Sequence, residues 1–127
     1  MRQVRVVKEK SEPISAGDVA GIARHYRDDG SFDAEMMERA AAADVRREFT
    51  LAELRSELQA DPRLVEDWLS WSAGKTSFPA WLFSDNGDET FAVCRLDQDG
   101  ELLREALFRD KFLACSAFII HEVEDHR

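Results

Sequence analysis

Residues 80–108 read AWLFSDNGDETFAVCRLDQDGELLREALF, and their turns and strand formers indicate a β-sheet. It contains Asp85-Asn86-Gly87, a strong hairpin signal, because Asn and Gly tolerate the left-handed backbone of tight turns. A second turn follows at Asp97–Gly100, and the residues between the two turns are rich in strand formers. We therefore expect a small antiparallel meander with strands at Ala80–Phe83, Thr90–Leu96 and Leu102–Phe108. The third strand is the least typical, because Leu, Glu and Ala also favour helices.

Four helical patterns precede the meander. Ser15 with Asp18, and Thr50 with Glu53, have the spacing of N-terminal capping boxes. The first of these helices is expected to run unbroken to Gly30. Further N-cap candidates are Asp33 for the second helix and Asp61, followed by Pro62, for the fourth.

A fifth helix follows the meander. Asp110 is its N-cap candidate, and Phe112, Cys115, Ile119 and Val123 form one apolar face with a second apolar face beside it. A stripe that wide packs against another layer, which we expect to be the sheet. The expected fold class is α+β, with N-terminal helices, a small antiparallel meander and a C-terminal helix packed on the sheet.

The chain has 127 residues, about the size of one domain, and carries 26 Asp and Glu against 17 Lys and Arg, a net charge of −9. We expect a single domain over 1–127, with a basic arm or edge strand at 1–13, helices at 15–74 and the meander with its closing helix at 78–127. The acidic balance opposes direct binding of nucleic acid. No apolar run is long enough to span a membrane, and no signal peptide is visible. Two cysteines are too few for a disulfide framework and favour a reducing cytoplasm.

No catalytic, metal-binding or cofactor-binding motif stands out. His121 and Asp125 share a helix face, but they lie in a charged C-terminal segment more typical of a solvated helix end. His25 is expected in the last turn of a helix, where it interacts with the negative end of the dipole. Cys94 and Cys115 lie in apolar patterns typical of buried, unreactive thiols. The sequence therefore predicts no enzyme activity, no metal and no cofactor.

Residues 50–71 have the outline of a helix-turn-helix, which raises DNA binding as an alternative. The second helix of such a motif presents basic or amide side chains to the major groove. Here it offers Arg63 beside Glu66 and Asp67, and the hairpin that follows is acidic. We therefore expect no sequence-specific recognition of DNA.

Residues 68–81 hold three tryptophans, a lysine and several hydroxyls around a junction between helix and strand. We expect Trp68 and Trp81 to fill the core between the helix and the sheet. Trp71 suits the core and the surface equally well. Together with Lys75 it is a candidate contact for a partner, because tryptophan is enriched in binding hot spots.

Residues 84–101 hold six acidic residues against the single Arg95. Such charges usually form a solvated surface. Concentrated on turns at one end of a sheet, they would also steer a basic partner by electrostatic attraction. The candidate partner-binding residues are therefore Trp71, Lys75, Asp85, Asp88, Glu89, Asp97 and Asp99.

Ser70-Trp71-Ser72, Lys75-Thr76-Ser77 and Ala80-Trp81 precede the Asn-Gly hairpin, and Ala114–Ile119 with Glu122 follow it. In this combination, residues 60–124 resemble the small bacterial immunity proteins of polymorphic-toxin systems. The resemblance implies a non-enzymatic cytoplasmic inhibitor that binds one cognate toxin, often a nuclease with a basic active-site cleft.

We therefore expect a binding protein of the immunity or antitoxin type, which neutralises a cognate protein toxin by masking a basic surface. In this hypothesis the acidic turns provide attraction, and Trp71 with Lys75 provides contact area and register. The alternative is a small adaptor or regulatory subunit of a larger bacterial complex, whose partner need not be basic.

Overall fold

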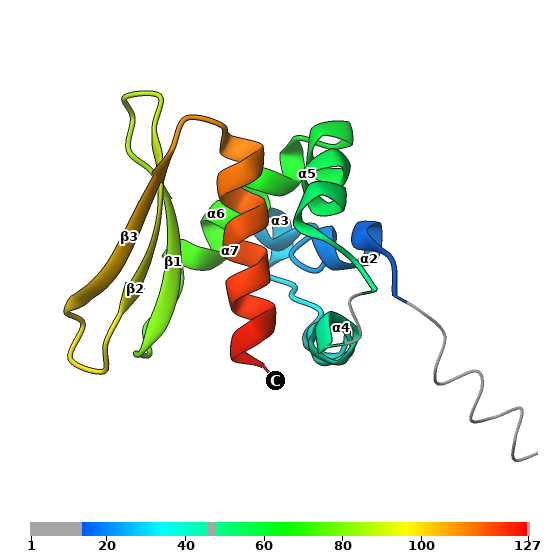
Figure 1. The fold of residues 1–127 in the computed structure, drawn as a ribbon, viewed down its shortest axis with the longest axis horizontal. Coiled ribbons are helices and arrows are strands. Elements are labelled where there is room, and N and C mark those ends of the chain that lie inside the picture. Colours follow the sequence, from blue (N-terminus) through cyan, green and yellow to red (C-terminus); the bar gives the residue numbers. More distant parts are fainter. Residues whose placement is uncertain (1–13, 46–47, 127) are drawn as a thin grey trace, which may run out of the picture.

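The computed structural model describes residues 14–45 and 48–126, and the segment predicted as a basic arm or edge strand lies outside them. Figure 1 shows a sheet on one side of the described chain and helices on the other. The elements in chain order are α2 (Ala16–Ala20), α3 (Tyr26–Asp29), α4 (Ala34–Val45), α5 (Leu51–Ala60), α6 (Arg63–Ala73), β1 (Ala80–Asp85), β2 (Phe91–Leu96), β3 (Leu102–Phe108) and α7 (Lys111–Asp125). The predicted α+β fold class is confirmed.

Three antiparallel strands form the sheet in the order β1-β2-β3, as the two turn signals predicted. The first strand extends two residues beyond its expected end, because Asp85 still pairs with Phe91. The pairing of β2 with β3 shifts by one residue between Arg95 and Leu96. The third strand forms as predicted, so cross-strand pairing prevails over the helix-favouring composition of its residues.

The helix α7 packs on one face of the sheet, which we call the inner face. The Trp81 ring stacks on His121 of α7 with 3.7 Å between centroids, and the Phe83 ring lies 5.6 Å from that of Phe118. Because side chains alternate along a strand, Leu82 and its partner Cys94 point to the opposite, outer face. Every labelled helix in Figure 1 lies on the inner side. The predicted packing of the C-terminal helix on the sheet is confirmed.

Trp68 lies at the centre of the core, fully buried. Its indole N–H donates a hydrogen bond of 2.9 Å to the carbonyl of Ala20. Its ring makes edge-to-face contacts with Phe32, Trp71 and Phe118, and so connects α6 with α7 and with the segment before α4. The predicted core position of Trp68 is confirmed, whereas Trp81 is only half-buried at the rim of the inner face.

The prediction of one unbroken first helix is wrong. It is replaced by α2 and α3, and between them His25 adopts a left-handed backbone with φ of 70°. In a continuous helix the Ala20 carbonyl would accept the N–H of Arg24, but here it accepts the indole N–H of Trp68. His25 therefore precedes a short helix instead of ending a long one.

Most of the predicted caps are confirmed. Ser15 and Thr50 form complete capping boxes, and Asp33 and Asp110 accept backbone N–H groups from the first turns of α4 and α7. Asp61 is the exception: α6 begins after Pro62 with no side-chain cap. The Asp61 carboxylate instead accepts a hydrogen bond of 2.8 Å from Arg24, a partner distant in sequence.

Trp68→Phe should lower the free energy of unfolding by about 2 kcal/mol, because the Ala20 carbonyl would stay buried without its donor. Trp71→Phe is the matched control and should cost less than about 1 kcal/mol, because the Trp71 ring is partly exposed. Urea unfolding followed by far-UV circular dichroism measures both. Equal losses in the two variants would contradict the role assigned to the indole hydrogen bond.

Candidate functional site

The acidic residues of the two hairpin turns lie at opposite ends of the sheet. Asp85 ends β1, and Asp88 and Glu89 belong to the turn between β1 and β2, whereas Asp97 and Asp99 belong to the turn between β2 and β3. Consecutive turns of an antiparallel meander alternate between the two ends of its strands, as Figure 1 shows. The expectation of one acidic patch at a single end is therefore wrong, and the charge is divided between two sites.

Several of these carboxylates also shape the turns that carry them. The Asp85 carboxylate accepts the N–H of Gly87 at 2.8 Å, and the Asp97 carboxylate accepts the N–H of Asp99 at 2.9 Å. A hydrogen bond from the Thr90 hydroxyl lowers the pKa of Asp88. This bond favours the ionised form of Asp88.

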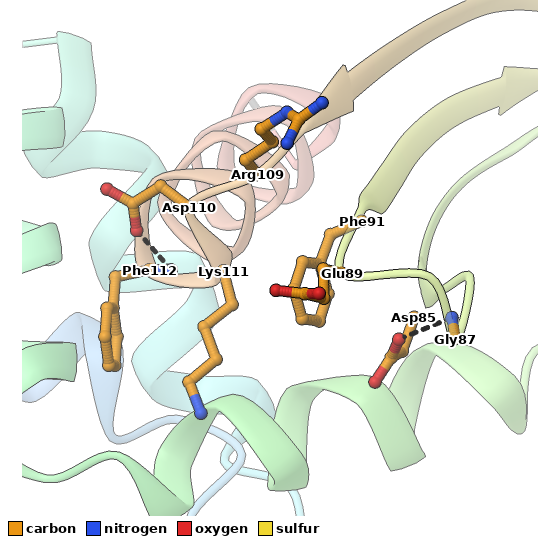
Figure 2. A pocket seen from close by; sticks show the side chains of 8 residues that line it. All are labelled: Asp85, Gly87, Glu89, Phe91, Arg109, Asp110, Lys111 and Phe112. Carbon is orange, nitrogen blue, oxygen red and sulfur yellow. Dashed lines mark hydrogen bonds between the residues drawn. The ribbon is translucent and has the colours of Figure 1, made fainter.

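A hollow of about 650 Å³ lies at the β1–β2 end, and Figure 2 shows the side chains that line it. Asp85 and Glu89 line it from the turn, and Arg109 and Lys111 line it from the connection into α7. The rest of its lining consists of Gly87, Phe91, Asp110 and Phe112. The two cations offset the acidic residues here. The residues from Asp97 to Glu101 also include no basic side chain, but Arg95 on β2 and Arg104 on β3 flank that turn, so acidic turn residues have cations near them at both ends.

Lys75 lies largely inside the protein, with 15% of its side chain exposed. Its ammonium group forms an ion pair with Glu122 of α7 and donates a hydrogen bond of 2.7 Å to the Trp81 carbonyl. It also lies 4.6 Å from the centroid of the Trp71 ring and 5.2 Å from that of Phe118. Burial lowers the pKa of Lys75 and raises the pKa of Glu122. Little of Lys75 is left for a partner, and its first role is internal.

Trp71 is half-buried and belongs to the aromatic cluster around Trp68. Its ring stacks on Phe32 with 4.5 Å between centroids. With Lys75 and Tyr26 it also borders a hollow of about 430 Å³ at the end of α6. The structure therefore places Trp71 and Lys75 together, on the helical side of the molecule and not with the acidic turns.

The C-terminal end of α7 is solvated, as predicted, only in its last residues. Glu122 is only 3% exposed, and Val123 beside it is fully buried. Contacts of α7 with the sheet and with α4 bury these two residues, whereas Glu124, Asp125 and His126 beyond them are exposed. Sequence reasoning did not predict the Lys75–Glu122 pair, because it is defined only once α7 packs beside the α6–β1 junction.

The candidate reactive residues have structural surroundings. Burial raises the pKa of both thiols, that of Cys115 well above its usual value. Cys115 is fully buried as predicted, whereas Cys94 is half-buried on the outer face. His25 is exposed and lies 3.6 Å from the Asp28 carboxylate, while His121 is stacked on Trp81. Within the described residues, no group of three or more His, Cys, Asp or Glu could hold a metal ion.

The outer face of the sheet is the largest feature that sequence reasoning missed. Leu102, Leu103 and Leu107 are 57%, 60% and 61% exposed, although leucine is usually buried. The half-buried side chains that continue this surface toward β1 are Leu82, Cys94 and Leu96. Glu105 pairs with Cys94 and therefore places a negative charge on the same face. The sequence did contain a signal for this surface: β3 has apolar residues on both of its faces, whereas a sheet covered on one side needs them on that side only.

Lys75→Met should destabilise the protein by about 3 kcal/mol at pH 7, because a buried carboxylate loses its partner. The stability of this variant should recover as pH falls toward 5. Burial raises the pKa of Glu122 in the folded state above its usual value of 4.5. As the pH falls, Glu122 is therefore protonated in the folded state before it is protonated in the unfolded state, and this stabilises the folded state.

Glu122→Gln is the matched variant, and its stability should not recover over that range. Burial lowers the pKa of Lys75, and the variant removes the carboxylate that opposes this lowering, so the unfolded state binds at least as many protons as the folded state and lowering the pH cannot stabilise the variant. Thermal unfolding between about pH 5 and 8 distinguishes the two. Identical pH profiles for both variants would contradict the assignment of the pair.

Comparison with known proteins gives no family for this chain: no family model, curated protein or solved structure matches it. Within residues 14–45 and 48–126, no helix combines the length and the apolar character needed to cross a bilayer. The features on which a function can be argued are thus the outer face of the sheet and the two acidic turns at its ends.

Proposed function

We propose that this chain is a non-enzymatic binding protein of the immunity type, which neutralises a cognate protein toxin by covering a basic part of its surface. One observation carries the proposal: the outer face of the sheet is apolar, lies away from the described helices and has an acidic turn at each end. Large exposed apolar patches with polar rims are typical of protein interaction sites.

The negative charges at both ends of the outer face favour a partner with positive charges at matching positions. The β2–β3 turn carries Asp97, Asp99 and Glu101, and the β1–β2 end of the sheet carries Asp85, Asp88 and Glu89. A partner that covers the leucines of β3 would meet negative charge at both ends. A surface with an apolar centre and basic side chains on both sides of it fits this arrangement.

The same charges disfavour a second copy of the chain as the occupant. Two outer faces packed together would bring the acidic turns of both copies close to one another. Each chain also carries a net charge of −9, so the approach is opposed from a distance. A basic protein meets neither obstacle, which supports a heterologous partner.

A binding role without catalysis is part of this proposal. The two thiols have raised pKa values and so little thiolate, and one face of the His121 ring is stacked on Trp81. We also place the protein in the cytoplasm. This setting agrees with two free cysteines, one of them half-buried on the outer face, in a compartment that keeps thiols reduced.

Asp99→Lys/Glu101→Lys should slow association with the partner on the order of 10-fold at low salt and little at high salt. The partner is first isolated by affinity capture from a lysate of the source cells, and stopped-flow mixing then gives the rate constants. Glu35→Lys/Glu38→Lys on α4 makes the same charge change away from the sheet and should leave the rate nearly unchanged. An unaffected rate in the first variant would remove the β2–β3 turn from the interface.

Leu102→Ser/Leu107→Ser should weaken the complex on the order of 100-fold, mainly through faster dissociation, because two leucines lose their burial. Leu51→Ser, at an exposed leucine of α5, is the control and should not change the affinity. Capture of a single basic protein that is lost with the first variant supports the immunity-type function. A large multi-protein assembly retained by both variants would instead favour an adaptor subunit.

A further inference from the structure

The two edges of the sheet differ in how their backbone groups are satisfied. At β1, the N–H of Phe83 donates a hydrogen bond of 2.7 Å to the Ser72 hydroxyl, and the carbonyl of Trp81 accepts one of 2.7 Å from Lys75. Both partners come from the C-terminal end of α6 or the residues just after it. The β1 edge is therefore closed by side chains of the same chain.

The β3 edge is open within the described chain, because the only strand paired with β3 is β2. Backbone groups alternate in direction along an antiparallel strand, and those of Phe83 point away from β2. Val93 lies opposite Phe83, so its backbone groups point away from β1 and toward β3. Ala106 lies opposite Val93, so its backbone groups point back toward β2. It follows that Glu105 and Leu107 direct their N–H and carbonyl groups to the free edge.

A hollow of about 380 Å³ lies beside this open edge, between β3 and α7. Two alanines, Ala106 of β3 and Ala117 of α7, leave space in it that larger side chains would fill. Its lining is completed by Trp81, Val93, Arg104, Glu105, Phe108 and His121. The hollow is mostly apolar and is large enough to hold an aliphatic or aromatic side chain.

We propose that an extended segment of a partner protein adds to the sheet as a fourth strand along β3 and places one apolar side chain in the hollow between β3 and α7. Main-chain hydrogen bonds to Glu105 and Leu107 would hold the segment, and the hollow would select its side chain. This site is separate from the outer face: the partner could cover the outer face with this edge left empty.

The charges of β3 define the chemistry of the added strand. Arg104 lies opposite Arg95, and like charges in that arrangement repel, so an acidic residue of the segment beside Arg104 would be favourable. A basic residue would be favourable beside Glu105 for the same reason. The segment therefore has an apolar residue opposite Ala106, followed by a basic and then an acidic residue when it runs antiparallel to β3.

A second copy of β3 does not meet this description. Antiparallel pairing of two β3 strands over their full length would place Glu105 directly opposite Glu105 of the other copy. Like charges at such a position are destabilising. The residues of β3 thus disfavour self-pairing while leaving the edge available to a different strand.

The test uses two labelled peptides of equal composition and measures binding by fluorescence anisotropy. Thr-Val-Ile-Lys-Glu-Val has the proposed order, and Thr-Val-Ile-Glu-Lys-Val exchanges the two charges. We expect the first to bind with a Kd on the order of 100 μM and the second at least about 5-fold more weakly. Equal affinities, or no binding of the first peptide up to about 1 mM, would overturn the proposal.

Variants of the protein locate the bound peptide. Ala117→Leu fills the hollow and should weaken binding of the first peptide about 10-fold, while Ala42→Leu on the exposed surface of α4 should not. Glu105→Pro removes an outward N–H, and Glu105→Ala keeps it. The proline variant should bind at least about 3-fold more weakly than the alanine variant, and equal binding would exclude strand addition.

The outcomes separate this site from the proposed function. Peptide binding that withstands Ala117→Leu but is lost in Leu102→Ser/Leu107→Ser would place the peptide on the outer face and overturn the β3–α7 site. Failure of both peptides to bind would also overturn it, yet would leave the outer face as the candidate surface for a basic partner.

Discussion

The packing of α7 against the inner face of the sheet is the contact on which the rest of the structure depends. Only Arg109 and Asp110 separate β3 from α7, so the chain must turn back sharply onto the sheet it has just completed. Asp110 holds this turn: it caps α7 and accepts hydrogen bonds of 2.6 and 2.8 Å from Arg55 of α5. The apolar faces of the helices then meet on one side of the sheet, and the leucines of β3 are left on the other.

The buried pair of Lys75 and Glu122 strengthens the same asymmetry. It joins the end of α6 to α7. Lys75 also donates a hydrogen bond to the carbonyl of Trp81, at the edge of β1 that faces away from β2. With β1 closed in this way, the open backbone edge and the exposed apolar side chains both belong to β3. Lys75, which the sequence marks as a partner contact, therefore acts inside the protein, where it satisfies a backbone group at the edge of β1.

Local features were predictable from the sequence, and features that depend on distant residues were not. The capping box of Thr50 and the Asn86-Gly87 turn need only neighbouring residues, so they were predicted correctly. Asp61 failed as a cap because its carboxylate binds Arg24, 37 residues away, and the first helix breaks because Trp68 takes the carbonyl of Ala20. Arg24 and Trp68 come close to Asp61 and Ala20 only after the chain has folded.

Part of the candidate site could have been predicted and was not. A meander alternates its turns between the two ends of the strands, so Asp85 and Asp97 could not lie at one end. The exposure of Leu102 and Leu107 required knowing that every described helix packs on the inner side, which composition and periodicity do not determine. The burial of Glu122 likewise depends on how α7 packs beside the sheet and α4.

Hydrogen–deuterium exchange, measured on the protein alone and in complex with the partner it captures, tests the central claim that the outer face of the sheet is the binding surface. We expect slower exchange of the amides of residues 97–108 in the complex, covering β3 and the turn before it, with α4 and α5 unchanged. Protection confined to α4 and α5, with residues 97–108 exchanging as in the free protein, would contradict it.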